Sequence, residues 1–268
     1  MKKSIDILMD SVRTILEEND VSAYLFGSIC LDDFKLGWSD IDILILTEKT
    51  ISEKQAEQLV NLRQALLEKY YGNPYFRSFE GGILSLNEFL NKKQERVVYW
   101  GTSGQRITDS YSFDVFSTMQ LKDYGILIYG NEIRDRIQYP TYDEMLQAVR
   151  NHYETIREYG VKPGRSLYSA GWMLDIARCL YTLAERKIIS KTKAGYWAIE
   201  KGLVPDAEVM KKVINIRENP LKHKDDIEVQ DWLEMLGPSI QEFADVLENK
   251  MTGAHLYSAI PGTQGNEE

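Results

Sequence analysis

The sequence predicts an α+β protein, in which helices flank a small sheet in an N-terminal domain and the C-terminal domain is a bundle of helices. Strand-like apolar runs lie before Pro140, and the segments after it place apolar residues at the three- and four-residue spacing typical of helices. The chain has 268 residues, which is more than a single domain usually contains. We therefore expect two domains, residues 1–139 and residues 140–268.

The first domain is expected to alternate helices and strands. Residues 4–18 form its first helix, because Ile5, Leu8 and Val12 recur at helical spacing. The other expected elements are helices at 51–70 and 113–121, strands at 21–26, 41–46, 75–86 and 126–129, and an apolar segment at 97–100.

The second domain is expected to contain helices only. They cover residues 142–158, 165–187, 190–202, 206–216 and 225–249. Gly160, Gly202 and Pro220 fall at or between the ends of these segments, where glycine and proline favour turns.

Composition limits the possible partners. The formal net charge is −9, so the chain has little electrostatic reason to bind a nucleic-acid backbone and favours a cationic small molecule. Two cysteines and three scattered histidines do not support a disulfide framework, a zinc site or a histidine-based triad. No apolar run approaches the roughly 20 residues of a membrane span, and the N-terminus does not read as a signal peptide. We expect a cytoplasmic monomer without membrane or nucleic-acid partners.

Two aspartates stand at the start of the strand expected at 41–46. Successive side chains of a strand point to opposite faces, so the carboxylates of Asp40 and Asp42 share one face, roughly 6.5–7 Å apart, while Ile41 and Ile43 point into a core. A half-buried carboxylate is costly unless a cation or donor satisfies it. Converging carboxylates suit Mg²⁺, which usually takes one or two of them together with substrate phosphates.

A glycine–serine turn precedes these aspartates. Gly27 lets the backbone turn sharply and approach a ligand closely. Ser28 is expected to cap a short helix over residues 29–33, whose free N–H groups would attract phosphate. The alternative is an ordinary strand–turn–strand with two solvated aspartates, and the presence of both halves together favours the binding site.

Glu80 is a candidate third carboxylate. It lies in the strand expected at 75–86, between Phe79 and a glycine pair. On a strand next to that of the aspartates, it would either bind the same metal or act as the general base that takes the proton of an acceptor hydroxyl. The spacing alone is equally consistent with a glutamate that faces solvent.

The glycine–serine turn and the aspartates resemble a known signature. Leu-Phe-Gly-Ser at 25–28, followed by Trp-Ser-Asp-Ile-Asp-Ile-Leu at 38–44, is similar to the G-S…D-x-D pattern of the nucleotidyltransferase superfamily that includes DNA polymerase beta. The resemblance implies a small mixed sheet and the transfer of a nucleoside monophosphate from a nucleoside triphosphate. It further implies that Mg²⁺ and the phosphates are held by Gly27, Ser28, Ser39, Asp40 and Asp42.

Within that superfamily, the chain resembles the streptomycin/spectinomycin adenylyltransferases. In those enzymes a glutamate on the strand after the long helix works with the two aspartates, and Glu80 is similar in position. The run from Leu174 to Ala198 resembles their C-terminal helical domain, where an arginine and a lysine 13 positions later face the nucleotide. Arg178 and Lys191 match that pattern, which implies that they bind ATP. By residue type alone, both would be ordinary surface cations.

One position departs from these relatives. Ten residues before the arginine they carry an aspartate that contacts the aminoglycoside, whereas this chain has Tyr168. Tyrosine offers a cation–π face but no ionic partner for an ammonium group. The other candidate contacts to the acceptor are Glu80, Trp172 and Asp175. Asp175 is expected on the same helix face as Tyr168.

The resemblance implies that AMP is transferred from ATP to a hydroxyl of a small cationic acceptor, an aminoglycoside-type antibiotic, with Mg²⁺ as cofactor. One alternative keeps nucleotidyl transfer but has a lincosamide or a protein as the acceptor. A second is a non-catalytic nucleotide-binding protein with a degenerate site. A third is an RNase, because Arg217 and His223 have the R-x5-H spacing of HEPN-type RNases.

Overall fold

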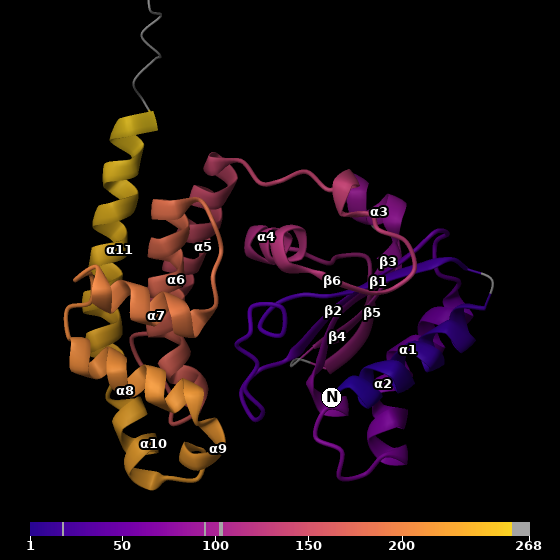
Figure 1. The fold of residues 1–268 in the computed structure, drawn as a ribbon, viewed down its shortest axis with the longest axis horizontal. Coiled ribbons are helices and arrows are strands. Elements are labelled where there is room, and N and C mark those ends of the chain that lie inside the picture. The colour runs from indigo at the N-terminus through magenta and orange to yellow at the C-terminus, as the bar shows by residue number, and fades with distance from the viewer. Residues whose placement is uncertain (18, 94, 102–103, 259–268) are drawn as a thin grey trace, which may run out of the picture. The chain divides into compact units, whose positions relative to one another are not determined.

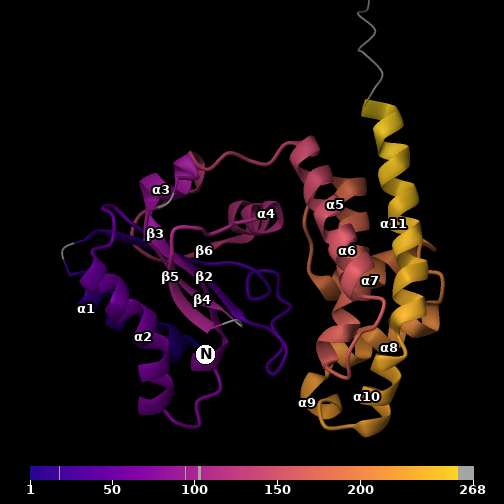
Figure 2. The same ribbon diagram turned by 180° about the vertical axis from the view of Figure 1, so that it is seen from behind.

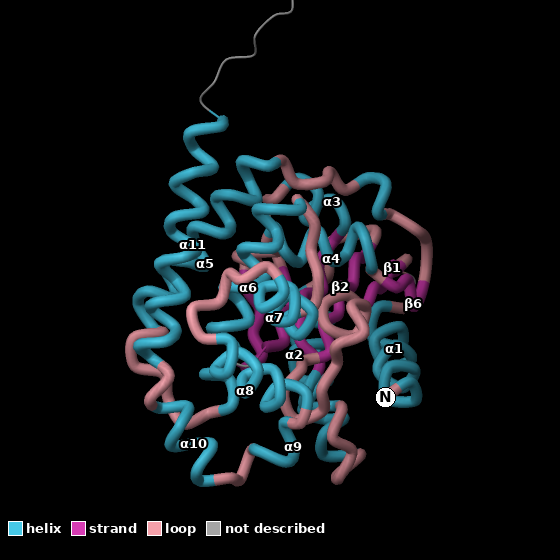
Figure 3. Tube along the Cα trace, turned by 60° about the vertical axis from the view of Figure 1, so that its left-hand side comes forward, coloured by secondary structure: helices cyan, strands magenta, loops and turns pink. Residues whose placement is uncertain are grey.

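The chain folds into two compact units. A computed structural model describes residues 1–17, 19–93, 95–101 and 104–258. The first unit contains Met1–Phe34 and Ser39–Pro140, and the second contains Lys35–Trp38 and the chain from Thr141 onward. Every described strand lies in the first unit, whereas the second consists of helices and loops (Figure 1 and Figure 3). The predicted α+β class, with a sheet followed by a helical region, is confirmed.

The described strands form one mixed sheet in the order β5-β4-β3-β2-β1-β6. Their bounds are Val21–Leu25 (β1), Ile41–Thr47 (β2), Phe79–Ser85 (β3), Val97–Gly101 (β4), Gly104–Thr108 (β5) and Ile126–Tyr129 (β6). β2 and β3 run parallel, and the other neighbouring pairs are antiparallel. The edge strand β5 was not expected, because its sequence Gly-Gln-Arg-Ile-Thr contains no apolar run.

Helices cover both faces of the sheet. α1 (Lys2–Leu16) and α2 (Glu53–Lys69) pack on one face, and α3 (Leu86–Asn91) and α4 (Val115–Tyr124) pack on the other (Figure 2). The third strand begins at Phe79 rather than at residue 75, because Phe76–Ser78 form a short 3-10 helix. It ends where the Ser85 hydroxyl caps α3, a helix that the sequence analysis did not expect.

The strand β2 contributes to both cores. Ile43 and Ile45 join the core beneath α1 and α2, whereas Leu44 and Leu46 join the core beneath α3 and α4. Because side chains two residues apart share a face, Asp42 lies on the same face of the sheet as Leu44. This alternation places the candidate carboxylate on the α3 and α4 side.

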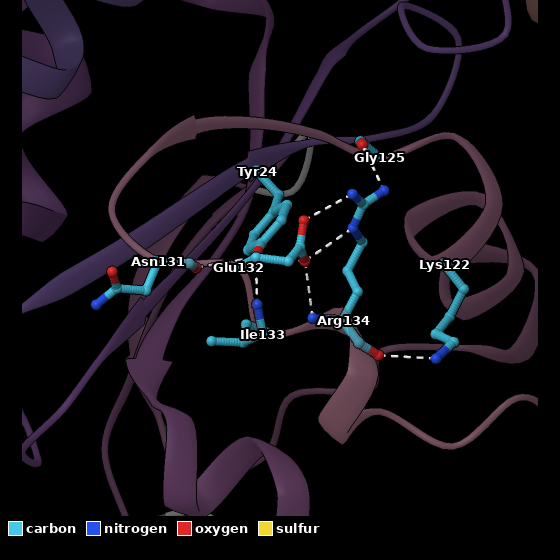
Figure 4. Close-up of polar contacts among 7 residues, drawn as sticks. All are labelled: Tyr24, Lys122, Gly125, Asn131, Glu132, Ile133 and Arg134. Carbon is cyan, nitrogen blue, oxygen red and sulfur yellow. Dashed lines mark hydrogen bonds and ion pairs between the residues drawn. The ribbon is translucent and has the colours of Figure 1, made fainter.

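A buried tyrosine anchors the segment after β6 to the sheet (Figure 4). The Tyr24 hydroxyl donates to Glu132 Oε1 at 3.0 Å, and burial raises the pKa of Tyr24 to about 12. Arg134 donates to both oxygens of Glu132, and these hydrogen bonds keep the pKa of Glu132 at about 2. Arg134 also donates to the Gly125 carbonyl. Lys122 Nζ donates to the Arg134 carbonyl at 2.7 Å. These contacts join β1, the end of α4 and the segment that leads to the second unit.

The second unit is built from helices. Their bounds are Tyr142–Tyr159 (α5), Gly171–Glu185 (α6), Lys191–Glu200 (α7), Ala207–Glu218 (α8), Pro220–His223 (α9), Ile227–Glu234 (α10) and Gly237–Ser258 (α11), with a short 3-10 helix at Leu167–Ala170. The helices expected at 142–158, 190–202 and 206–216 are confirmed as α5, α7 and α8. The helix expected at 165–187 begins later, at Gly171, as α6. Tyr168 lies in the preceding 3-10 helix, so the expectation that it shares a helix face with Asp175 is wrong.

The single helix expected over residues 225–249 is wrong. The chain breaks after α10, and α11 begins at Gly237 followed by Pro238. Proline has no N–H group and fits only the first turn of a helix, so this pair starts a new helix instead of continuing the old one. None of the helices in the described ranges combines the length and apolar character that crossing a membrane would require.

Candidate active site

Two of the predicted carboxylates are neighbours on adjacent strands. In the parallel pair β2 and β3, Asp42 is in register with Glu80, and both side chains are half-buried. Residues in register on neighbouring strands point to the same face of a sheet, so both carboxylates lie on the α3 and α4 side. Asp40, two residues before Asp42, is also half-buried.

The turn after β1 packs against Asp42. Gly27 has a φ of +70°, and a Cβ atom at this position would lie 1.8 Å from Asp42 Oδ2. The Phe26 N–H donates to the Asp42 carbonyl at 3.1 Å. Only glycine fits this position, because any side chain would both strain the backbone and displace the carboxylate. The two halves of the predicted signature are therefore in direct contact.

The helix expected over residues 29–33 is wrong. These residues form consecutive turns, in which the Asp33 N–H donates to the Ser28 carbonyl at 2.9 Å. Ser28 caps nothing: its Oγ is buried and has no hydrogen-bond partner among the residues that the structure describes. A buried hydroxyl without a partner is costly, so this atom suits an oxygen of a ligand bound at the turn.

The donor atoms at this site suit Mg²⁺ bound together with a nucleotide. Within the described ranges, no three His, Cys, Asp or Glu side chains are grouped so as to hold a metal ion by themselves. Asp40 and Asp42 offer two carboxylates, which is the number that Mg²⁺ commonly takes from a protein when phosphates complete its shell.

A tyrosine that the sequence pattern did not single out lies beside Glu80. The Tyr99 hydroxyl, on β4, donates to Glu80 Oε1 at 2.7 Å. Burial, together with this hydrogen bond to Glu80, raises the pKa of Tyr99 to about 12. The guanidinium of Arg106 lies 4.4 Å from the centre of the Tyr99 ring.

Arg63 is a second residue that was missed. Its Nη1 donates to the Phe79 carbonyl at 2.8 Å, and its Nη2 donates to the Gly101 carbonyl at 3.2 Å. Burial lowers the pKa of Arg63, whereas the nearby Glu80 and Asp40 carboxylates raise it. Its position among the apolar residues of α2 was a signal in the sequence, because it lies three residues before the buried Leu66.

The second unit brings the two predicted cations to one carboxylate. Arg178 donates to Asp175 Oδ1 at 2.9 Å, and Lys191 donates to Asp175 Oδ2 at 3.0 Å. The side chain of Arg178 is 13% exposed, that of Lys191 is 27% exposed and that of Asp175 is 16% exposed. Burial raises the pKa of Asp175, but Lys191 and Arg178 outweigh it and bring the pKa to about 2. Burial lowers the pKa of Lys191, and Asp175 opposes this effect.

These contacts bear on the predicted acceptor residues. Both oxygens of Asp175 already bind cations, so an acceptor ammonium group would compete with Arg178 and Lys191 for them. The Tyr168 hydroxyl donates to the Trp38 carbonyl at 3.2 Å, and the Tyr168 ring packs edge-on against the Trp38 ring. Tyr168 as a residue is 58% exposed. Trp172 is half-buried in the first turn of α6.

The R-x5-H residues lie on different helices. Arg217 is buried in the last turn of α8, with its guanidinium 5.1 Å from the centre of the Trp38 ring. His223 ends α9, and its Nε2 lies 2.9 Å from Asn215 Oδ1. No contact that the structure describes pairs the two side chains for catalysis.

Comparisons with known proteins agree with this architecture. Residues 5–81 match the family model of the nucleotidyltransferase domain, and residues 141–248 match that of the aminoglycoside adenylyltransferase C-terminal domain. The crystal structure of the spectinomycin adenyltransferase AAD(9) from Enterococcus faecialis, with ATP and spectinomycin, is similar in fold, with a TM-score of 0.61. The match has 17% sequence identity and covers 92% of this chain and 99% of that one. No curated protein sequence matches the chain.

Proposed function

Because the chain combines a nucleotidyltransferase domain with an aminoglycoside adenylyltransferase C-terminal domain, we propose that it transfers AMP from ATP to a hydroxyl of a small cationic antibiotic. The observation that carries this proposal is the neighbourhood of Asp42. Its carboxylate packs against the Gly27 turn, its register partner is Glu80, and the buried Ser28 hydroxyl lies next in the chain to Gly27. Nucleotidyl transfer needs acidic metal ligands, phosphate donors and a base at one place.

Asp40 and Asp42 are proposed to hold Mg²⁺. The ion, when bound with ATP, would neutralise charge that develops on the phosphates and on the leaving pyrophosphate. The Gly27 backbone and the hydroxyls of Ser28 and Ser39 are proposed to bind phosphate oxygens. The orphaned Ser28 Oγ supports this assignment, because a phosphate oxygen would give it the partner that it lacks.

Glu80 is proposed to be the general base. As the acceptor oxygen bonds to the α-phosphorus, the hydroxyl proton passes to the Glu80 carboxylate, and the bond from the α-phosphorus to the pyrophosphate oxygen breaks. The register of Glu80 with Asp42 supports this role, since the base must lie within hydrogen-bond reach of the acceptor at the metal site.

Arg178 and Lys191 are proposed to bind the triphosphate of ATP. Their convergence on one carboxylate supports this role, because Asp175 holds both cations in fixed positions.

The acceptor is proposed to be an aminoglycoside-type antibiotic. The crystal structure of the similar AAD(9) contains spectinomycin together with ATP, and the net charge of −9 favours a cationic ligand. Tyr168 and Trp172 would offer aromatic faces to its ammonium groups. The cytoplasmic location, the monomeric state and the absence of nucleic-acid partners stay predictions.

The test is pyrophosphate release from ATP and Mg²⁺ with spectinomycin, streptomycin and a lincosamide in turn. Release with spectinomycin or streptomycin, lost in Asp42→Asn, supports the proposal. Release only with the lincosamide would change the acceptor and keep the reaction. ATP that binds but is not consumed with any acceptor would instead support a non-catalytic nucleotide-binding protein.

A further inference from the structure

A tyrosine outside the predicted signature lies against the proposed base. Tyr99 pairs with Gly82 in the antiparallel ladder of β3 and β4, so its side chain shares the face of Gly82 and of Glu80, two residues earlier. Its hydroxyl donates to Glu80 Oε1 at 2.7 Å. Within the described residues, the hydrogen bond that the Glu80 carboxylate accepts is this one, at Oε1. The other oxygen, Oε2, can therefore take the proton of the acceptor hydroxyl.

We propose that Tyr99 is a positioning residue for Glu80: the Tyr99 hydroxyl orients the Glu80 carboxylate. This inference rests on the proposed function, in which Glu80 is the base. A base contributes to the rate only when its free oxygen is held within reach of the acceptor hydroxyl. A hydrogen bond to a carboxylate is among the stronger ones in proteins, so it can hold that orientation.

The surroundings hold the Tyr99 ring in place. The Arg106 guanidinium lies 4.4 Å from the centre of the Tyr99 ring. The centres of the Tyr99 and Tyr111 rings are 5.9 Å apart. Tyr111 can approach β3 because residue 82 is glycine: a Cβ atom there would lie 2.6 Å from the Tyr111 ring. A ring fixed by two neighbours loses little further freedom when its hydroxyl binds Glu80.

The protonation state agrees with this role. Burial and the hydrogen bond to Glu80 raise the pKa of Tyr99 to about 12, so its hydroxyl keeps its proton at neutral pH and acts as a donor. A tyrosine in that state cannot serve as the base itself. The assignment therefore separates two tasks, proton acceptance by Glu80 and orientation by Tyr99.

The chain offers a matched control in Tyr24. Its hydroxyl donates to Glu132 at 3.0 Å, it lies on the same sheet, and burial likewise raises its pKa to about 12 (Figure 4). Glu132 has no part in the proposed reaction. Tyr24→Phe therefore removes a tyrosine–glutamate hydrogen bond, together with the one that the Tyr24 hydroxyl accepts from the Ile133 N–H at 2.8 Å, without touching the proposed base. Tyr99→Phe removes the hydrogen bond to the proposed base.

The first experiment needs no acceptor. Glutamates are labelled with carbon-13 at the side-chain carboxyl, and the Glu80 signal is identified by its loss in Glu80→Gln. In Tyr99→Phe, the Glu80 carboxyl signal at neutral pH should shift away from its position in the unsubstituted chain, because the hydrogen bond from the Tyr99 hydroxyl is gone. It should not move in Tyr24→Phe. An unchanged Glu80 signal in Tyr99→Phe would overturn the inference.

The second experiment measures AMP transfer to spectinomycin at neutral pH. Tyr99→Phe should lower kcat/KM by roughly tenfold, and Tyr24→Phe should leave kcat/KM unchanged. In a Glu80→Gln background, Tyr99→Phe should have little further effect, since both changes act through one group. If Glu80→Gln abolishes transfer but Tyr99→Phe leaves it unchanged, the role of Tyr99 is rejected and the proposed function stands. Full activity of Glu80→Gln would reject the base itself.

Discussion

Replacing Asp175 by asparagine would remove the carboxylate that Arg178 and Lys191 share. Both hydrogen bonds, at 2.9 and 3.0 Å, lie in a part of the second unit where the Asp175 side chain is only 16% exposed. Asparagine keeps the shape of the side chain and loses its charge. The two cations would then lie close together without this shared anion, which is unfavourable in a poorly solvated place.

The expected loss of stability follows from the pKa of Asp175. Its value is about 2, against 3.8 for an ordinary aspartate. Such a gap corresponds to roughly 2–3 kcal/mol of unfolding free energy at neutral pH. Breaking a buried ion pair by removing one partner typically costs about 3–5 kcal/mol. We expect Asp175→Asn to lower the unfolding free energy of the second unit by roughly 2–4 kcal/mol.

The sign of the pH dependence follows from the direction of the shift. The pKa is lowered on folding, so the stabilisation by Asp175 is fully present above its ordinary value of 3.8 and is lost as the pH falls towards about 2. The difference between the unsubstituted chain and Asp175→Asn should therefore be constant at neutral pH and shrink in acid. A difference that grows in acid would contradict the linkage.

The assay is urea unfolding followed by circular dichroism, with Asp245→Asn as the control. Asp245 forms an ion pair with Arg157 in the same unit, but its side chain is 62% exposed, so its loss should cost less than about 1 kcal/mol. Calorimetry with ATP and Mg²⁺ should also show weaker binding in Asp175→Asn. If Asp175→Asn destabilises the unit no more than Asp245→Asn does, the reasoning about the shared carboxylate is refuted.

Three further predictions concern the first unit. Gly27→Ala should lower the unfolding free energy by roughly 1–3 kcal/mol and turnover by about a hundredfold. The added Cβ would collide with Asp42 Oδ2, and alanine is strained at the φ of +70° that Gly27 adopts. Unchanged turnover would exclude close packing of Gly27 against Asp42. Asp42→Asn should lower turnover by about 10²–10³-fold while circular dichroism stays unchanged, and wild-type turnover would reject the metal assignment. Ser28→Ala should not lower the unfolding free energy, because it removes a buried Oγ that has no partner in the described structure. It should weaken ATP binding roughly threefold to tenfold, and equal ATP affinity would remove Ser28 from the site.

The positions of most elements were determined by the sequence itself. The common face of Asp40 and Asp42 stays a prediction, because β2 begins at Ile41 and Asp40 lies before it. These properties depend on local periodicity, because a strand repeats every two residues and a helix every 3.6. The same local rules missed β5 and α3, whose sequences have no long apolar pattern. They also predicted one helix across Gly237 and Pro238, where helical spacing continued past a pair that starts a new helix.

Only the tertiary structure decided what the carboxylates touch. The register of β2 with β3 sets Glu80 beside Asp42, and that register depends on hydrogen bonds between strands 38 residues apart in the chain. The Tyr99 hydroxyl on Glu80 and the sharing of Asp175 by Arg178 and Lys191 are likewise contacts between elements. Spacing along one chain can place a side chain on a face, but the packing of several segments is needed to give it a partner.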